Sequence, residues 1–190
     1  GAGRFLVSGG GVYRVFIQEG SFSSEIEFTW DRLVDICRID DNQALVVGQK
    51  GEIIMEDDGG WRSYETREYR DFYGCGAGFG SVVAVGQGGL VVTQTELDDG
   101  LQSREAGVMV DLYDAVVVDK DIFVVVGESG LIMISSDGGD SWESAESPND
   151  LDSFSSVCVG QNGWCVAASF SGAEEKESRS FGDSATHHPF

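Results

Sequence analysis

The sequence predicts an all-β fold built from repeated four-stranded antiparallel units, and two observations lead to this expectation. The first is a recurring motif of two apolar residues, Gly, two variable residues, Gly, one variable residue and two apolar residues. Its second glycines are Gly51, Gly89 and Gly130. The second is that short apolar runs, rich in Val, Ile and Phe and bounded by Gly, Asp or Asn, are typical of strands. No segment keeps the 3.6-residue apolar period of a long helix.

The third copy of the motif shows the order of elements within one unit. The expected elements are a first strand at 112–118, a turn at 119–121, a second strand at 122–126, a tight connection at 127–130, a third strand at 131–135, a turn at 137–139 and a fourth strand at 141–145. Fainter copies flank the three clear ones. The N-terminal copy, at 6–13, begins at a second strand. The C-terminal copy has a first strand at 154–159 and a second at 164–168.

A four-stranded antiparallel unit that recurs at intervals of roughly forty residues predicts a β-propeller. We expect one propeller domain over residues 1–172. Residues 173–190 form a polar segment that is either a closing strand or a mobile tail. The 190 residues allow five blades with irregular ends, and four blades closed by strand exchange are the alternative. Closure of the ring is expected because it removes exposed strand edges.

One turn of the third copy carries a motif with a local structural role. Its residues are Ser135, Asp137, Gly139, Ser141 and Trp142, which match Ser-x-Asp-x-Gly-x-Ser-Trp, the Asp-box. A short Asp side chain can accept hydrogen bonds from turn amides, and a Trp ring is a large apolar anchor. A shortened version consists of Asp58, Gly59 and Trp61, and the copy at 98–100 lacks the Trp.

The Val-Val-Gly-x-x-Gly-x-Ile motif and the Asp-box together resemble Asp-box (BNR-type) β-propellers. Among these, the chain is most similar to the family related to the photosystem II stability and assembly factor. The resemblance implies a structural role for Asp137 and Trp142 on the outer rim. It also implies a non-enzymatic scaffold that binds a protein partner. Sialidases, other glycosidases and sortilin-like receptors also carry Asp-boxes, so a carbohydrate-binding protein or a reduced glycosidase is the alternative.

The charge of the chain excludes several classes of partner. It has 33 acidic and 12 basic residues, for a net charge of −21. Nucleic-acid binding needs a basic surface, and anionic membranes repel an acidic one. No apolar run reaches the roughly 20 residues that span a bilayer, so we expect no membrane insertion.

The excess of acidic residues also indicates a protein adapted to high salt. Arg outnumbers Lys nine to three, and this composition resembles that of proteins from salt-accumulating halophiles such as haloarchaea. Molar salt screens the repulsion between like charges. The expected location is the cytoplasm of such an organism, or outside the cell after removal of a leader.

We expect no catalytic residues, no metal site and no cofactor. His187 and His188 lie in the C-terminal tail, and the arginines lack the context of a sialidase motif. With 33 acidic residues, a carboxylate pair at glycosidase spacing can arise by chance. Asp pairs at 40–41, 57–58 and 98–99 lack the spacing of a calcium loop.

The remaining candidates are cysteines and channel residues. The cysteines form no CxxC pair and are expected to be buried free thiols; they are Cys37, Cys75, Cys158 and Cys165. Arg38, Tyr73 and Tyr113 are large polar side chains on expected inner strands, so they are candidates for lining the channel or contacting a partner.

Overall fold

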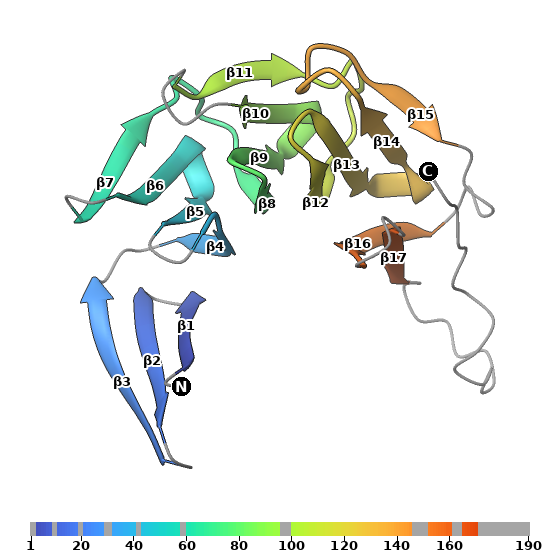
Figure 1. The fold of residues 1–190 in the computed structure, drawn as a ribbon. Helices are drawn as coiled ribbons and strands as arrows, with labels where there is room; N and C mark the ends of the chain where they lie inside the picture. Colours follow the sequence, from blue (N-terminus) through green and yellow to red (C-terminus); the bar gives the residue numbers. More distant parts are fainter. Residues whose placement is uncertain are drawn as a thin grey trace.

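The protein is a β-propeller whose blades form an open arc (Figure 1). The computed structural model describes residues 3–8, 11–18, 21–28, 32–40, 43–57, 60–95, 100–145, 152–160 and 165–170. These residues form five antiparallel sheets, three of them with four strands. The expected all-β class and the four-stranded antiparallel blade are therefore confirmed.

Each sheet follows the chain from the inside of the arc to the outside. The first sheet contains β1 (Gly3–Ser8), β2 (Val12–Gln18) and β3 (Ser21–Phe28). The second contains β4 (Leu33–Arg38), β5 (Ala44–Gly48), β6 (Glu52–Asp57) and β7 (Gly60–Glu65). The third contains β8 (Phe72–Gly78), β9 (Ser81–Gly86), β10 (Leu90–Gln94) and β11 (Gln102–Glu105). The fourth contains β12 (Leu112–Asp119), β13 (Ile122–Gly127), β14 (Ile132–Ser135) and β15 (Glu143–Ala145). The fifth contains β16 (Ser153–Val159) and β17 (Cys165–Phe170).

The two ends of the arc do not meet in a shared sheet. Figure 1 shows β1–β3 at one end and β16–β17 at the other. Among the described residues, the first sheet has three strands, with β1 nearest the inside of the arc. The expectation that the N-terminal copy begins at a second strand stays a prediction. The described part of the last sheet holds a first and a second strand. The expected closure of the ring is therefore not seen among the described residues, and residues 173–190 lie outside them.

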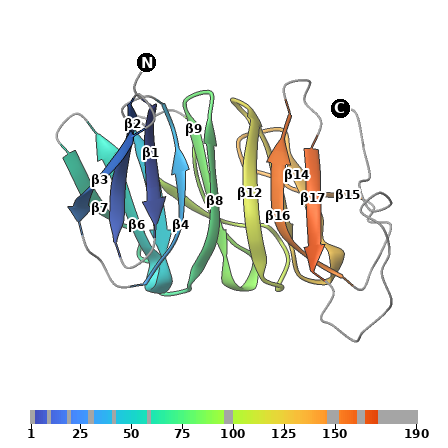
Figure 2. The same ribbon diagram turned by 90° about the horizontal axis from the view of Figure 1, so that it is seen from below.

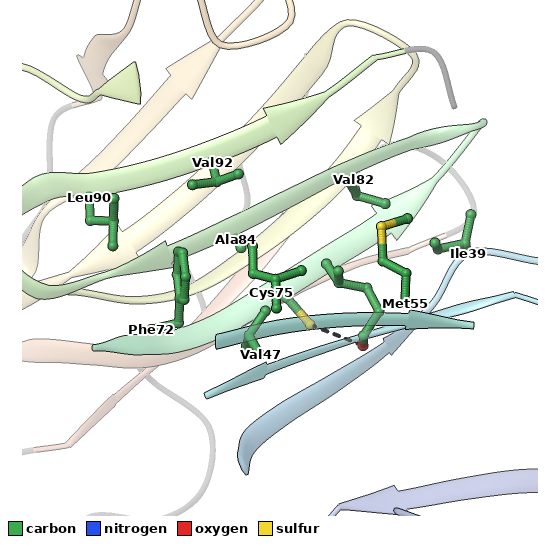
Figure 3. Close-up of a cluster of buried hydrophobic side chains, with 11 residues drawn as sticks. Ile39, Val47, Met55, Phe72, Cys75, Val82, Ala84, Leu90 and Val92 are labelled. Atoms are coloured by element: carbon green, nitrogen blue, oxygen red, sulfur yellow. Dashed lines mark hydrogen bonds between the residues drawn. The ribbon is translucent and has the colours of Figure 1, made fainter. Parts of the chain in front are cut away.

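The core consists of seams between neighbouring blades. The second strands are buried on both faces, because alternate side chains enter the seams on either side of the blade. In the third blade, Val82 and Ala84 face the second blade, whereas Val83 and Val85 face the fourth. Figure 3 shows the seam between the second and third blades, where Phe72 and Leu90 pack with Val47.

The cysteines correct one expectation. Cys75 is buried in that seam, Cys37 is half-buried against it, and Cys158 is exposed. The side chain of Cys165 lies outside the described part of the chain. Cys158 is paired with Val166 in the two-stranded sheet at one end of the arc. Among the described residues, no further blade follows this sheet to bury the Cys158 side chain. Cys37 and Cys75 precede the first glycines of their turns, Gly48 and Gly86, by the same number of residues, and this spacing suggests equivalent positions. They are not equivalent, because Cys75 follows Phe72 by three residues, whereas Cys37 follows Leu33 by four.

Alternating strand directions give the arc two distinct rims. The hairpins between first and second strands and between third and fourth strands lie on one side, which we call the hairpin rim. On the other side lie the Gly-x-x-Gly turns and the segments that lead to the next blade, at 66–71 and 106–111. We call this side the turn rim. Figure 2 shows the strands running between the two rims.

Candidate binding surface on the turn rim

The Gly-x-x-Gly motifs form short 3₁₀ turns, η1 (Gln49–Gly51), η2 (Gln87–Gly89) and η3 (Glu128–Gly130). The middle residue of each turn is left-handed, and its amide donates a hydrogen bond to the start of the next blade. These bonds are Lys50 N to Asp71 Oδ1 (2.8 Å), Gly88 N to Asp111 Oδ1 (2.9 Å) and Ser129 N to Ser153 Oγ (3.3 Å). The repeated motif therefore links each blade to the next along the turn rim.

The second glycine of the motif lets the connecting segment pass close by. A Cβ on Gly51 would lie 2.1 Å from the carbonyl oxygen of Glu68, and one on Gly89 would lie 2.1 Å from that of Val108. Both glycines also have positive φ. These contacts bring the connecting segments 66–71 and 106–111 directly over η1 and η2.

Tyr73 and Tyr113 begin the inner strands of the third and fourth blades and lie together. Their ring centroids are 5.9 Å apart and the rings are tilted by 40°. Burial raises the pKa of Tyr73, and the negative charges of Asp111 and Asp71 raise this pKa further. Burial also has the largest effect on Tyr113 and raises its pKa, and the negative charges of Asp111 and Glu128 raise this pKa further.

Two exposed side chains lie on the connecting segments of the same rim. Tyr69 is 87% exposed and Met109 is 95% exposed. Each lies four residues before one of the paired tyrosines, at the corresponding place in two consecutive blades. The sequence analysis missed them. The signal that could have found them is a large side chain that recurs outside the strands, four residues before Tyr73 and before Tyr113.

An ionic cluster anchors the first connecting segment to the outer strand β11. The guanidinium of Arg70 lies 3.1 Å from a carboxylate oxygen of Glu68 and 2.7 Å from one of Glu105. Ser103 Oγ donates to Glu68 at 2.5 Å. The hydrogen bond with Glu105 is the main reason that the pKa of Arg70 is raised. This cluster fixes the backbone that carries Tyr69.

Arg38 lies away from the tyrosine pair. It ends β4, at the hairpin rim, where its Nε donates to the carbonyl oxygen of Asp40 at 2.7 Å. Of the three candidate channel residues, the structure thus brings Tyr73 and Tyr113 together and leaves Arg38 on the opposite rim.

The turn at 135–142 is a compact hydrogen-bonded hairpin between the outer strands β14 and β15. Asp137 accepts from Ser141 N (2.9 Å), from Ser141 Oγ (2.5 Å) and from Ser135 Oγ (2.8 Å), and Gly139 N donates to Ser135 Oγ (2.8 Å). These hydrogen bonds, first among them that from the Ser141 hydroxyl, lower the pKa of Asp137 to about 2. Asp140 also pairs with Arg104 of the preceding blade.

Trp142 follows this turn and packs against the seam with the third blade. Trp61 precedes Arg62 on β7 as Trp142 precedes Glu143 on β15, and it packs against the seam with the first blade. Leu101 has this place in the third blade, where the sequence lacks the Trp. Asp58 and Gly59 lie outside the described residues.

Two aspartates that the sequence analysis missed bridge neighbouring inner strands. Asp35 Oδ2 accepts from Cys75 N at 3.0 Å, and Asp114 Oδ2 accepts from Val157 N at 2.8 Å. Burial raises the pKa of Asp114, while its hydrogen bonds act in the opposite direction. The recurrence of Leu-x-Asp at 33–35 and 112–114 was the available signal. These half-buried side chains hydrogen-bond across the seams between neighbouring blades.

The described side chains provide no evident metal site. Within the described ranges, no three His, Cys, Asp or Glu side chains gather closely enough to hold an ion. Across the same residues, no helix has the length and apolar character needed to cross a bilayer.

The chain matches no protein-family model and no curated protein sequence. Among solved structures, it is similar to YCF48 bound to D1 peptide, with a TM-score of 0.58 and 14% identity over 72% of this chain and 47% of that one. It is also similar to YCF48 from Cyanidioschyzon merolae, with a TM-score of 0.56 and 17% identity over 73% of this chain and 50% of that one. The chain thus spans about half the length of these YCF48 structures.

A third similar structure is the WD40 β-propeller domain of Doa1, with a TM-score of 0.61 and 16% identity over 86% of this chain and 59% of that one. At these identities the likeness shows the fold, which is a β-propeller that resembles YCF48.

Proposed function

We propose that this protein is a non-enzymatic β-propeller scaffold that binds a protein partner on its turn rim, as an assembly factor does. The observation that carries the proposal is the group formed by the Tyr73–Tyr113 pair and the exposed Tyr69 and Met109. Exposed apolar groups that gather on one face mark interaction sites. Tyr and Met are enriched in the cores of protein interfaces.

The solved structures support this mode of binding without identifying the partner. One of them holds YCF48 with a D1 peptide, so a propeller of similar shape can take a peptide. An extended peptide is the partner that fits a row of side chains on consecutive blades. The residues from Ser135 to Trp142 have a different role in this proposal, because they tie outer strands and seams together on the opposite rim.

A peptide selection tests the proposal. A library of random short peptides is displayed and selected on the folded protein in molar KCl. We expect enriched peptides whose binding is lost when Tyr69→Ser and Met109→Ser are combined. Phe79→Asn is the matched control, because Phe79 is 66% exposed on the hairpin rim. Peptides that bind all three proteins equally would place the site elsewhere and contradict the proposal.

The carbohydrate alternative is settled by a glycan array at the same salt concentration. We expect no specific sugar binding by the wild-type protein. Saturable binding of one glycan that is lost in Tyr73→Ala would replace the scaffold proposal, because the face of an aromatic ring can also pack against a sugar.

A further inference from the structure

The tyrosine pair of the turn rim lies among carboxylates. Besides burial, the negative charges of Asp71 and Asp111 raise the pKa of Tyr73, and those of Asp111 and Glu128 raise the pKa of Tyr113. These carboxylates come from the beginnings of two inner strands and from η3. Three carboxylates contributed by two consecutive blades therefore lie close enough to these rings to raise their pKa values.

The carboxylates are held in place by the fold and retain room for a ligand. Asp71 and Asp111 each accept a backbone amide of a Gly-x-x-Gly turn through Oδ1, from Lys50 N and Gly88 N, and Asp111 also hydrogen-bonds the side chain of Tyr73. A carboxylate has two oxygens and several acceptor sites, so each can accept a further donor. Glu128 is the first residue of η3 and is exposed.

Arg70, the cation nearest in sequence to Asp71 and Tyr73, is engaged by other carboxylates. Arg70 is bound by Glu68 and Glu105, on the side of β11. Lys50 lies on η1 of the second blade, two blades before the fourth blade that carries Tyr113, and its backbone amide donates to Asp71. The chain as a whole carries a net charge of −21, which favours a cationic partner, although at molar salt this attraction acts only over a few ångströms.

The side chains around the carboxylates suit one kind of cation. A guanidinium stacks on aromatic faces and binds carboxylates with two parallel hydrogen bonds, whereas an ammonium is a compact, strongly hydrated charge. Two tilted tyrosine rings next to several carboxylates offer both interactions at one place. Tyr69 and Met109 can cover the apolar part of a bound segment.

We infer that the Tyr73–Tyr113 pair, with Asp71, Asp111 and Glu128, binds an arginine side chain of an extended partner segment. This inference rests on the proposed scaffold function and specifies the chemistry of its partner. The segment passes from the third blade to the fourth, with Tyr69 and Met109 against the residues that flank the arginine.

Matched peptides test the inference. The probes are fluorescent alanine-based peptides with one central arginine, the same peptides with citrulline, which keeps the shape but removes the charge, and the same peptides with lysine. We expect the arginine peptide to bind at least about fivefold more tightly than the citrulline peptide, with the lysine peptide in between. Fluorescence anisotropy measures the affinities in a KCl concentration at which circular dichroism shows the protein folded.

Variants locate the effect on the turn rim. Glu128→Gln is expected to weaken arginine-peptide binding about threefold, and Tyr113→Leu to weaken it more than Tyr113→Phe, which keeps the ring. Glu143→Gln is the matched control, since it removes the same charge from an exposed position on β15. Equal losses in Glu128→Gln and Glu143→Gln would mean diffuse charge attraction and would overturn the inference.

The inference and the scaffold proposal fail in different ways. Equal affinity for the arginine and citrulline peptides overturns the arginine site, while selected peptides that depend on Tyr69 and Met109 would still support the scaffold. If no selected peptide depends on these two residues, the scaffold proposal fails first.

Discussion

The two glycines of the repeated turn have different physical roles, although the sequence pattern treats them alike. The first, such as Gly86, comes close to its own blade, since a Cβ there would lie 2.1 Å from the carbonyl oxygen of Asp71. The second, such as Gly89, meets the connecting segment at the same distance and also has a φ of +80°. The residue between them, Gly88, is left-handed but has open space around it.

This difference predicts the cost of two neighbouring substitutions. Gly89→Ala should lower the free energy of unfolding by roughly 3 kcal/mol, because it adds a left-handed side chain and a clash with the backbone of Val108. Gly88→Asn should cost about 1 kcal/mol or less, since Asn tolerates this backbone and meets no atom. Urea denaturation in molar KCl measures both values.

The repeat itself supplies the control for this comparison. Lys50 and Ser129 occupy the place of Gly88 in the other turns with φ of 59° and 58°. A Gly88→Asn variant as unstable as Gly89→Ala would show that the turn demands glycine for its backbone conformation alone.

At the scale of the element, the hairpin at 135–142 is stabilised by one carboxylate. Asp137 accepts three hydrogen bonds within the turn, from Ser141 and Ser135. They favour the charged form, and its pKa falls from the usual 3.8 to about 2. A carboxylate with a lowered folded-state pKa stabilises the fold above its unfolded pKa, and this contribution is lost as the pH falls through the folded value.

The expected pH dependence follows from that sign. Asp137→Asn should melt at a lower temperature than the wild-type protein at neutral pH, and the difference should shrink as the pH falls from about 4 towards about 2. Differential scanning fluorimetry follows the melting temperatures, and the NMR shift of the Ser141 amide follows the carboxylate directly. Asp119→Asn is the control, because Asp119 accepts a hydrogen bond from the amide of its neighbour Lys120 at an exposed position. A constant difference between wild type and Asp137→Asn down to the lowest pH would contradict the role of the charge.

Most strand boundaries were predictable from local patterns. The expected strands at 112–118 and 122–126 appear as Leu112–Asp119 and Ile122–Gly127. The fourth strand begins later than predicted, at Glu143, because Ser141 uses its amide to bond Asp137 and leaves the strand ladder. Counting back from the first glycine of the turn does not predict which way Cys37 and Cys75 face, because the paired residues Leu33 and Gly48 are one position further apart in sequence than the equivalent pair Phe72 and Gly86.

At the scale of the whole molecule, the blades hold together through apolar seams. We propose that the acidic residues form a surface adapted to high salt in the cytoplasm of a salt-accumulating organism. At about 0.1 M salt the Debye length is about 10 Å, and at about 1 M it is about 3 Å, so molar salt screens most of the repulsion of a net charge of −21.

The melting temperature should therefore rise markedly from dilute buffer to molar KCl. Differential scanning calorimetry measures the change. Sucrose is the control, because it favours the compact state by exclusion but does not screen charge. A melting temperature that rises equally in sucrose and KCl, or not at all, would contradict the proposed adaptation.

The candidate site was only partly predictable from the sequence. Tyr73 and Tyr113 were found because large polar side chains on inner strands stand out in an apolar repeat. Tyr69 and Met109 were missed because the sequence shows their shared position in the repeat but does not show that their side chains are exposed. Arg38 shared the sequence criterion with the tyrosines, but it ends its strand at the hairpin rim, whereas the tyrosines begin theirs at the turn rim.

The sequence by itself determined the strands, the turns and the blade as the repeating unit, because apolar alternation and glycine conformation act over a few residues. Only the tertiary structure decided which side chains each seam buries, that the described strands at the two ends of the arc form separate sheets, and that Tyr73 and Tyr113 lie together. These features depend on how one blade packs against the next, and the contacts involved join residues about forty positions apart, which no local pattern encodes.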